Sequence, residues 1–379
     1  MRLLTIREQE AGQRADKYLS RYLEQASKSF LYKMLRKKNI TLNGGRCEGS
    51  EKLKAGDQLR IFFSEETLAK FQGTALPPKN APGPHTSAAG CDHVLKGSLA
   101  PGPGDALDPR RIVYEDTHLL LYDKPAGLLS QKARGDDISA VELVLAYLQS
   151  KGELTDESYR RFHPSVCNRL DRNTSGLLIV GKTMAGLQTM SALLKERTLH
   201  KDYLCCVRGQ VTNPCRLKGY LYKDTDKNQV RILDTACPGA QPIETVYTPV
   251  ALFGADAGPA GRTGGKSAAG PSALFPLTHL QVRLVTGRSH QIRAHLASVG
   301  WPVIGDYKYG LRPVNEFYKK RLGLQHQLLH AWQLTFPVVE GALSYLSGRV
   351  FRAPVPDLFE QAGRLAEETS VSRQAAQRK

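Results

Sequence analysis

Short apolar runs separated by turn-forming residues recur along the chain after about residue 110, and they predict a β-rich domain. The runs lie at 112–114, 119–122, 177–180, 200–207, 230–233, 243–247 and 277–285. Between these runs, apolar residues at helical spacing predict helices. One contains Val141 to Leu148, and another follows a Thr183 cap. A further helix follows a Ser289 cap and has the apolar stripe Ile292, Leu296 and Val299. The predicted fold class is α+β, with a large mixed, mostly antiparallel sheet, flanking helices and a central cleft.

The first 63 residues predict a separate, small α+β module. A helix over 14–23 precedes a second helix that Ser27 caps, and short strands are expected at 40–42 and 59–63. A run of charged residues most often forms only a solvent-exposed surface with no binding role. Here a helix, a basic turn and a small sheet share one unit, which favours phosphate binding. The cations expected to make those contacts are Arg14, Lys28, Lys33, Arg36 and Lys37.

Composition divides the rest of the chain. Residues 64–109 are rich in Pro, Gly and Ala and predict a flexible linker, and a similar stretch at about 254–273 predicts a loop insertion. The second domain is then expected over 110–360. The polar residues 361–379 predict a disordered tail.

The net charge indicates the class of binding partner, and the cysteine content indicates the cellular compartment. The chain has 53 Lys and Arg against 36 Asp and Glu, a formal net charge of +17, which favours a polyanionic partner such as a nucleic acid. No apolar run approaches the length that spans a membrane, so no membrane partner is expected. Seven cysteines without a C-x-x-C pair suit reduced thiols in the cytoplasm.

One stretch combines charge with turn chemistry just before a buried strand. Asp171 lies between Arg169 and Arg172, and turn-forming residues 173–176 lead into the apolar run 177–180. Nearby cations favour the charged form of a carboxylate, so the sequence predicts an ionised Asp171 on a tight loop. Taken alone, this pattern would fit a surface ion pair better than a reactive group.

Four segments, in this order and spacing, resemble the RluA family of pseudouridine synthases. They are Tyr114-Glu115-Asp116 with Asp123-Lys124-Pro125-Ala126-Gly127, Asn168 to Gly176, Lys201-Asp202-Tyr203, and Thr286 to His295 continued by Gly305-Asp306 and Tyr309-Gly310. Asn168 and Asp123 depart from the histidine and asparagine that are usual in the family. The first module is similar to the αL-type RNA-binding domain, also found in a small-subunit ribosomal protein. The matching pieces are 14–19, 27–29, 40–43 and 55–57.

The resemblance implies a bacterial RNA-modifying enzyme of the pseudouridine synthase fold and assigns roles to particular residues. Asp171 matches the catalytic carboxylate, Arg293 the arginine that pairs with it, and Tyr203 the tyrosine placed against the target base. Arg169, Leu329, His290 and Gln291 are expected to contact or wall the flipped nucleotide.

Isomerising uridine involves no redox change or phosphate transfer, so no cofactor is expected. His326 and His330 have metal-ligand spacing, but no third ligand is evident in the sequence, so no metal site is expected.

Lys201-Asp202-Tyr203-Leu204 looks like the RluC-like branch, which favours large-subunit ribosomal RNA as the substrate. Transfer RNA is the alternative substrate, and a non-catalytic RNA-binding or ribosome-assembly factor is the alternative function. A protein of this kind is expected to act as a monomer.

Overall fold

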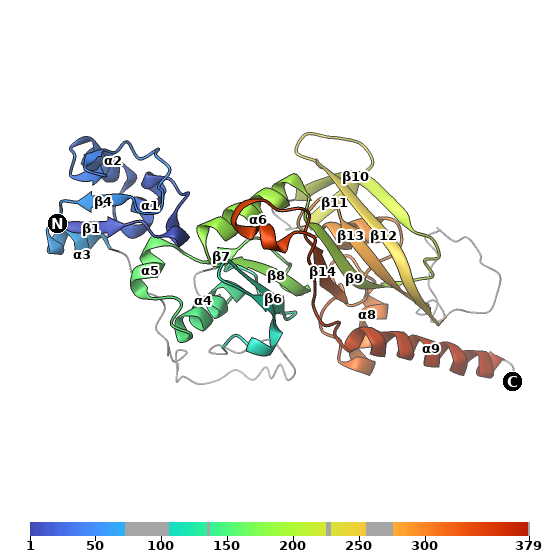
Figure 1. Ribbon diagram of the computed structural model, residues 1–379. Helices are drawn as coiled ribbons and strands as arrows, with labels where there is room; N and C mark the ends of the chain where they lie inside the picture. The colour runs from blue at the N-terminus through green and yellow to red at the C-terminus, as the bar shows by residue number, and fades with distance from the viewer. Residues whose placement is uncertain (73–105, 135–136, 225–228, 255–275, 378–379) are drawn as a thin grey trace, which may run out of the picture.

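A small amino-terminal module and a large domain make up the protein in a computed structural model (Figure 1). The structure describes residues 1–72, 106–134, 137–224, 229–254 and 276–377. Most of the predicted linker and nearly all of the predicted insertion at 254–273 lie outside these residues.

The amino-terminal module is a four-stranded antiparallel sheet with helices packed on it. The strand order is β1 (Arg2–Thr5), β4 (Gln58–Ile61), β2 (Ile40–Leu42) and β3 (Gly45–Arg46). Helices α1 (Ala15–Tyr22) and α2 (Lys28–Arg36) follow the 3-10 turn η1 (Glu8–Glu10). The Ser27 hydroxyl accepts a hydrogen bond from the Phe30 amide at 3.3 Å, which confirms the predicted cap.

The module extends farther than the sequence predicted. Residues Glu65–Phe71 form helix α3, which Ser64 caps, and Leu68 is buried in the same apolar core as Leu19 and Leu31. The predicted linker start at residue 64 is therefore wrong. A helix of about two turns with one buried leucine is hard to distinguish from the Pro- and Gly-rich residues that follow it.

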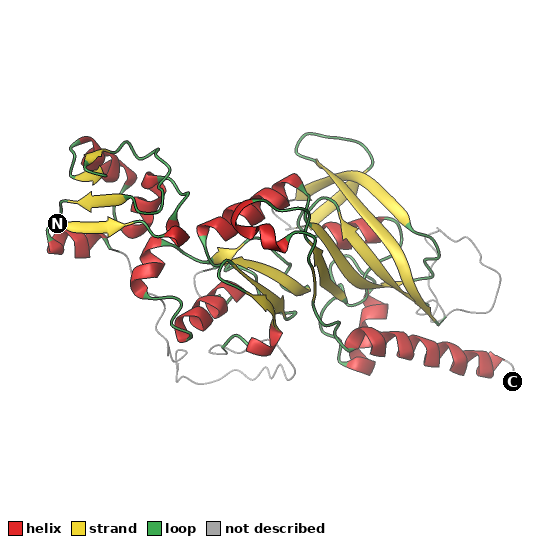
Figure 2. Ribbon diagram, in the orientation of Figure 1, coloured by secondary structure: helices red, strands yellow, loops and turns green. Residues whose placement is uncertain are grey.

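In the residues that the structure describes, the large domain is built on an eleven-stranded sheet, whose strands are shown in Figure 2. The main path runs β11 (Gln229–Leu233), β10 (Cys215–Asp224), β12 (Gln241–Phe253), β13 (Leu277–Leu284), β9 (His200–Arg208), β14 (Leu329–Thr335), β8 (Ser175–Gly181), β6 (Leu119–Lys124) and β5 (Ile112–Glu115). Strand β15 (Val350–Arg352) pairs with β14, and β7 (Ser165–Val166) pairs with β8. Every pairing is antiparallel except the one between β14 and β8. The predicted mixed, mostly antiparallel sheet is confirmed.

Helices cover both faces of the sheet, which explains why its central strands are continuous apolar runs. Leu178 and Val180 face the core that contains α4 (Ala140–Ser150), whereas Leu177 and Ile179 face the core that contains α6 (Met184–Glu196). The remaining elements are α5 (Asp156–Arg161), α7 (Gln291–Ser298), α8 (Arg312–Leu322), η2 (Pro109–Arg111) and η4 (Gly341–Leu346). Thr183 caps α6 as predicted.

Two helix predictions need correction. The predicted disordered tail at 361–379 lies largely within α9 (Leu358–Gln377), whose Ala362 and Ala366 are buried on the large domain. Small alanines give no visible apolar stripe, so the sequence pattern missed this packing. Helix α7 is preceded by His290 rather than capped by Ser289, and Val299 is 40% exposed rather than buried.

A buried arginine connects the two parts of the molecule. Arg161, at the end of α5, donates to the Thr5 carbonyl at 3.3 Å and lies 3.8 Å from the Glu10 carboxylate. The Arg161 carbonyl accepts from Arg21 at 3.2 Å, and Gln188 on α6 donates to Gly12 at 3.0 Å. These contacts hold the module against α5 and α6.

Candidate active site

Backbone hydrogen bonds shape the loop that presents Asp171. The Thr174 amide donates to the Asp171 carbonyl at 3.0 Å and closes a turn just before β8. The Arg172 carbonyl accepts from the Gly127 amide at 2.8 Å and from the Lys124 amine at 3.1 Å. Lys124 is fully buried, and burial lowers its pKa to about 7. The loop is thus tied to the segment that follows β6.

Gly176 permits the parallel pairing of β8 with β14. Its φ is +107°, and a Cβ there would lie 2.3 Å from the Ala331 carbonyl oxygen. Any side chain would therefore push the two strands apart. The close approach brings Leu329 of β14 to the same side as the Asp171 loop, where both line one cleft.

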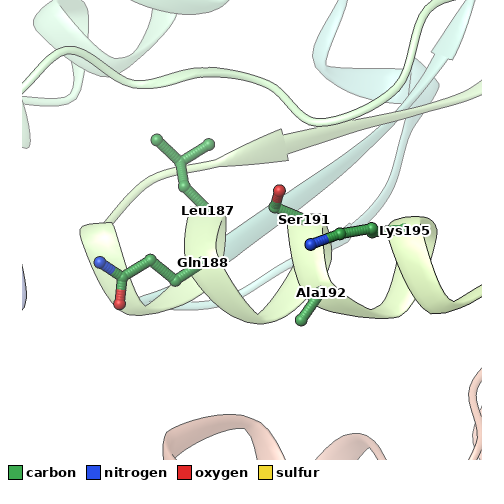
Figure 3. Close-up of a pocket in the computed structure, with 5 residues that line it drawn as sticks. All are labelled: Leu187, Gln188, Ser191, Ala192 and Lys195. Carbon is green, nitrogen blue, oxygen red and sulfur yellow. The ribbon is translucent and has the colours of Figure 1, made fainter.

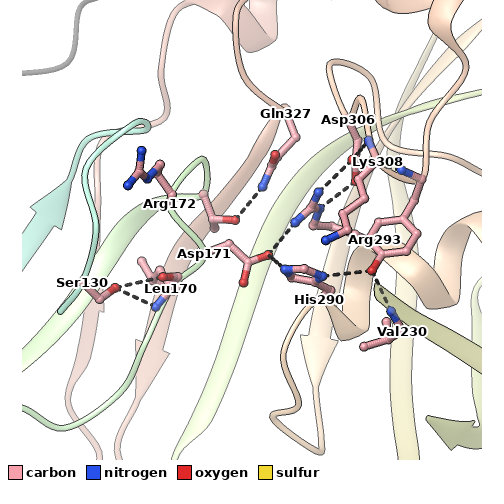
Figure 4. A network of polar contacts seen from close by, with 12 residues as sticks. Ser130, Leu170, Asp171, Arg172, Val230, His290, Arg293, Asp306, Lys308 and Gln327 are labelled. Atoms are coloured by element: carbon pink, nitrogen blue, oxygen red, sulfur yellow. Dashed lines mark hydrogen bonds and ion pairs between the residues drawn. The ribbon is translucent and has the colours of Figure 1, made fainter. Parts of the chain in front are cut away.

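Arg293 of α7 links two carboxylates (Figure 4). Its Nη1 donates to Asp171 Oδ2 at 2.8 Å, while Nε and Nη2 donate to Asp306 at 2.7 and 2.8 Å. Burial of Asp306 by itself raises its pKa, but the hydrogen bonds and charge of Arg293 lower that pKa overall. Burial by itself lowers the pKa of Arg293. The hydrogen bonds and charge of Asp306 outweigh the effect of burial, so the pKa of Arg293 is raised overall.

The partner of Asp171 is therefore not one of its neighbours in sequence. Arg172 lies 3.8 Å from Asp137, and Arg169 is exposed at the edge of the cleft. Neither adjacent arginine has an ion pair with Asp171 among the described residues, and the contact comes instead from Arg293 of α7, the partner that the resemblance predicts.

His290 approaches the same carboxylate from an unusual backbone conformation. Its φ is +58°, which turns the ring towards Asp171, with Nε2 4.0 Å from Oδ2. On its other side, Nδ1 lies 2.9 Å from the Tyr309 hydroxyl, and that hydroxyl accepts from the Val230 amide at 3.1 Å. Since the Tyr309 oxygen already accepts a hydrogen bond from Val230, its own hydroxyl hydrogen is available to donate to Nδ1, which favours the tautomer with hydrogen on Nε2.

Gln291 is held entirely by protein groups that the structure describes. Its side-chain oxygen accepts from the Thr286 hydroxyl at 2.8 Å and from the Arg288 amide at 3.1 Å. Its nitrogen donates to the Glu244 carbonyl and the Thr245 hydroxyl, both at 3.0 Å. The side chain is 2% exposed, so this geometry fixes the loop before α7.

Asp171, His290, Gln291 and Arg293 line a cleft of about 1050 Å³. Tyr203 of β9 is 7% exposed and lines it, and burial, together with the charge of Asp171, raises the Tyr203 pKa. Among the described residues that line the cleft, Asp171 is the only carboxylate. Besides Arg293, the lining cations are Lys132, Arg169, Arg172, Lys195, Arg197, Lys201 and Arg288. Such a lining suits a polyanion.

The structure brings the predicted site residues of the large domain together. Those that line the cleft are Asp171, Tyr203, Arg293, Arg169, Leu329, His290 and Gln291. The predicted phosphate contacts of the first module lie elsewhere. Arg14, Lys28, Lys33, Arg36 and Lys37 are exposed on or beside α1 and α2, and Arg14 is paired with Asp16 at 2.9 Å.

Asp306, Tyr309 and Lys124 belong to the matched motifs and support the site, but the sequence pattern assigns them no role. The two departures from the family pattern also have partners. Asn168 accepts from the Ile179 amide at 2.8 Å and donates to the Leu177 carbonyl at 3.3 Å, which secures the backbone of β8. Asp123 is paired with Arg111 at 3.2 Å.

A second hollow, of about 460 Å³, lies along α6 and is lined by Leu187, Gln188, Ser191, Ala192 and Lys195 (Figure 3). It contains no carboxylate, histidine or thiol. Across the described ranges, no group of three or more His, Cys, Asp or Glu side chains is placed to hold a metal ion. His330 belongs to β14 and His326 precedes that strand, so they do not share a helix face. No described helix is long and apolar enough to cross a membrane.

Known proteins are similar in sequence to most of this chain. The family model described as RNA pseudouridylate synthase matches residues 118–298. A protein of Escherichia coli named ribosomal large subunit pseudouridine synthase C is 30% identical over 339 residues, which cover 89% of this chain and 88% of that protein. Its namesake from Vibrio vulnificus is 30% identical over 336 residues, with the same two coverages. The solved structure of human RNA pseudouridylate synthase domain containing 1 covers 69% of this chain and 97% of its own, at 22% identity and a TM-score of 0.45.

Proposed function

Because the chain belongs to the RNA pseudouridylate synthase family, we propose that it isomerises uridine to pseudouridine in large-subunit ribosomal RNA. The substrate follows from the names of relatives that align along most of both chains. The observation that carries the proposal is the position of Asp171, the one carboxylate among the described lining residues, 2.8 Å from Arg293 in the same cleft as Tyr203.

The reaction breaks the bond between uracil N1 and the sugar C1′, turns the detached base and rejoins it through C5. An ionised carboxylate beside the sugar can attack it or remove a proton from it. Arg293 orients Asp171 through a charge-assisted hydrogen bond to Oδ2. The His290 approach is also to Oδ2, so the other oxygen, Oδ1, is directed to the nucleotide in this proposal.

Tyr203 and Leu329 form the uracil slot in this proposal. Both are buried side chains of adjacent strands, β9 and β14, and both line the cleft. The phenol of Tyr203, whose pKa is raised by burial, is neutral at physiological pH as an ordinary tyrosine is, which suits stacking on a base. Arg169, exposed at the edge, contacts the RNA strand. A base inside a duplex must be extruded to enter such a slot.

The basic surfaces retain the RNA during this step. The cleft lining provides one group of cations, and the exposed α2 face with Lys28, Lys33, Arg36 and Lys37 provides another. Gln291 acts by holding the loop that carries His290. We expect the protein to work as a monomer in the cytoplasm and to need no cofactor.

Tritium release tests the function directly. Ribosomal RNA and transfer RNA labelled with tritium at uracil C5 are incubated separately with the protein, since forming the new bond expels that hydrogen. Release from large-subunit ribosomal RNA, and its loss in Asp171→Asn, supports the proposal. Asp234→Asn, at an exposed aspartate outside the cleft lining, is the matched control and should release tritium normally. Tritium release from transfer RNA alone would contradict the proposed ribosomal RNA substrate. Release from neither RNA would contradict the proposed enzymatic function.

A further inference from the structure

Lys201 is a buried lysine that faces the cleft. It lies on β9 two residues before Tyr203, so both side chains project from the same face of the strand. Lys201 is 9% exposed and lines the cleft with Tyr203. Asp202 points to the opposite face, where it is paired with Arg283 at 2.9 Å. The nearest carboxylate in sequence therefore does not neutralise Lys201.

A second cation lies beside it. Arg197 ends α6 with a φ of +61° and lines the same cleft as an exposed side chain. Burial lowers the pKa of Lys201, and the positive charge of Arg197 lowers it further. Within the described part of the chain no carboxylate pairs with either side chain. Two cations held together this way are unfavourable until an anion joins them.

We propose that Lys201 and Arg197 form a binding site for one phosphodiester group of the RNA strand that carries the target uridine. The site rests on the proposed function, because the uracil that stacks on Tyr203 brings its own backbone to this end of the cleft. Two residues of β-strand span about 6.6 Å, so the bound phosphate belongs to the target nucleotide or its neighbour. A phosphate oxygen accepts charge-assisted hydrogen bonds from both cations.

Neutral backbone linkages test the site. Tritium release first locates the target uridine in a short RNA, and the phosphodiesters on its 5′ and 3′ sides are then replaced, one at a time, by methylphosphonate. Binding is measured in an Asp171→Asn background, so that no turnover occurs. One replacement should weaken binding about tenfold, the loss expected for a charged hydrogen bond. Lys201→Met should bind the unmodified RNA about tenfold more weakly, and the replacement should then cause a smaller loss than in the parent, because only Arg197 still contacts the phosphate.

Matched variants make the result decisive. Lys201→Arg should restore sensitivity to the replaced phosphate, and Arg197→Met, at an exposed position, should reduce that sensitivity even if Lys201→Met fails to fold. Lys320→Met, on the exposed surface of α8 outside the cleft lining, should respond like the parent. If Arg197→Met and Lys201→Met both keep the full loss at each linkage, the phosphate site is wrong. Failure of the parent to release tritium would instead overturn the proposed function.

Discussion

Asp306 and Asp171 bind the same guanidinium, with Asp306 taking Nε and Nη2 of Arg293 and Asp171 taking Nη1. Asp306 is completely buried, whereas the Asp171 side chain is 25% exposed to the cleft. The buried carboxylate therefore fixes the plane of the arginine, and the arginine fixes the exposed carboxylate. We therefore expect Asp306 to affect the proposed reaction only through the position of Arg293.

Replacing Asp306 with Asn should lower kcat with little change in RNA binding. The variant loses the paired charge that orients Arg293, and a misplacement of about 1 Å can cost about 100-fold in rate. Single-turnover tritium release measures the rate, and RNA titration measures Kd. Asp202→Asn is the control, because Asp202 is an equally buried aspartate paired with an arginine on the other face of β9. A rate equal to that of the unmodified protein would show that Arg293 keeps its orientation without Asp306.

Arg293→Lys should be nearly inactive although the positive charge is kept. A lysine amine is a single point and cannot span two carboxylates as a guanidinium does. The rate of tritium release should fall about 100-fold or more, as for loss of a positioned electrostatic contact. Arg283→Lys, which alters the pair with Asp202, should keep its activity. Comparable activity in both variants would mean that charge alone suffices at position 293.

Acid should destabilise the protein partly through His330. This side chain is fully buried, its Nδ1 lies 2.9 Å from the Ser175 hydroxyl, and burial lowers its pKa from 6.5 to about 4. Between these values the unfolded chain binds the proton and the folded chain does not, so stability falls as the pH falls through this window. His330 should contribute about 2–3 kcal/mol of that loss by pH 4.5.

Urea unfolding from pH 7 to pH 4.5 measures the effect. His330→Gln cannot take up the proton and should lose less free energy of unfolding than the parent over this range. His200→Gln removes an exposed histidine of β9 and should follow the parent. Parallel curves for the parent and His330→Gln would show that another group controls the acid transition.

Neutralising Lys33, Arg36 and Lys37 together should flatten the salt dependence of RNA binding. Each phosphate contact contributes about 0.7–0.9 to the slope of log K against log salt, so the slope should fall by about 2 to 3. The same triple alanine change at Lys319, Lys320 and Arg321 removes equal charge from exposed positions on α8. If the two triple variants have the same slope, the charge of α2 is incidental.

Sequence pattern predicted the sheet and gathered the groups around the cleft, because strands buried on both faces and motifs of fixed spacing leave local traces. Local pattern alone does not identify the partner of Asp171, because Arg293 lies 122 residues away, and only the resemblance to a known family predicted that pair. Neither hydrophobic period nor composition reports which way a side chain on a tight turn points.

Packing that rests on one or two small or isolated apolar residues was equally invisible. Ala362 and Ala366 dock α9 although their surroundings read as polar, and Leu68 docks α3 within a stretch that resembles a linker. In the sequence, Lys201 is only a member of the Lys201-Asp202-Tyr203 motif and has no role of its own. Its burial next to Arg197, which only the structure gives, distinguishes it from a solvent-exposed lysine.

The buried Arg161 has a consequence for which RNAs can be substrates. By joining α5 to Thr5 and lying close to Glu10, it holds the α2 surface and the Asp171 cleft in one frame. An RNA that occupies both must present a backbone segment and an extruded uridine at one set separation. The distance between the two binding surfaces is then fixed. The folded shape of an RNA, in addition to the nucleotide sequence around the uridine, therefore decides whether that RNA fits.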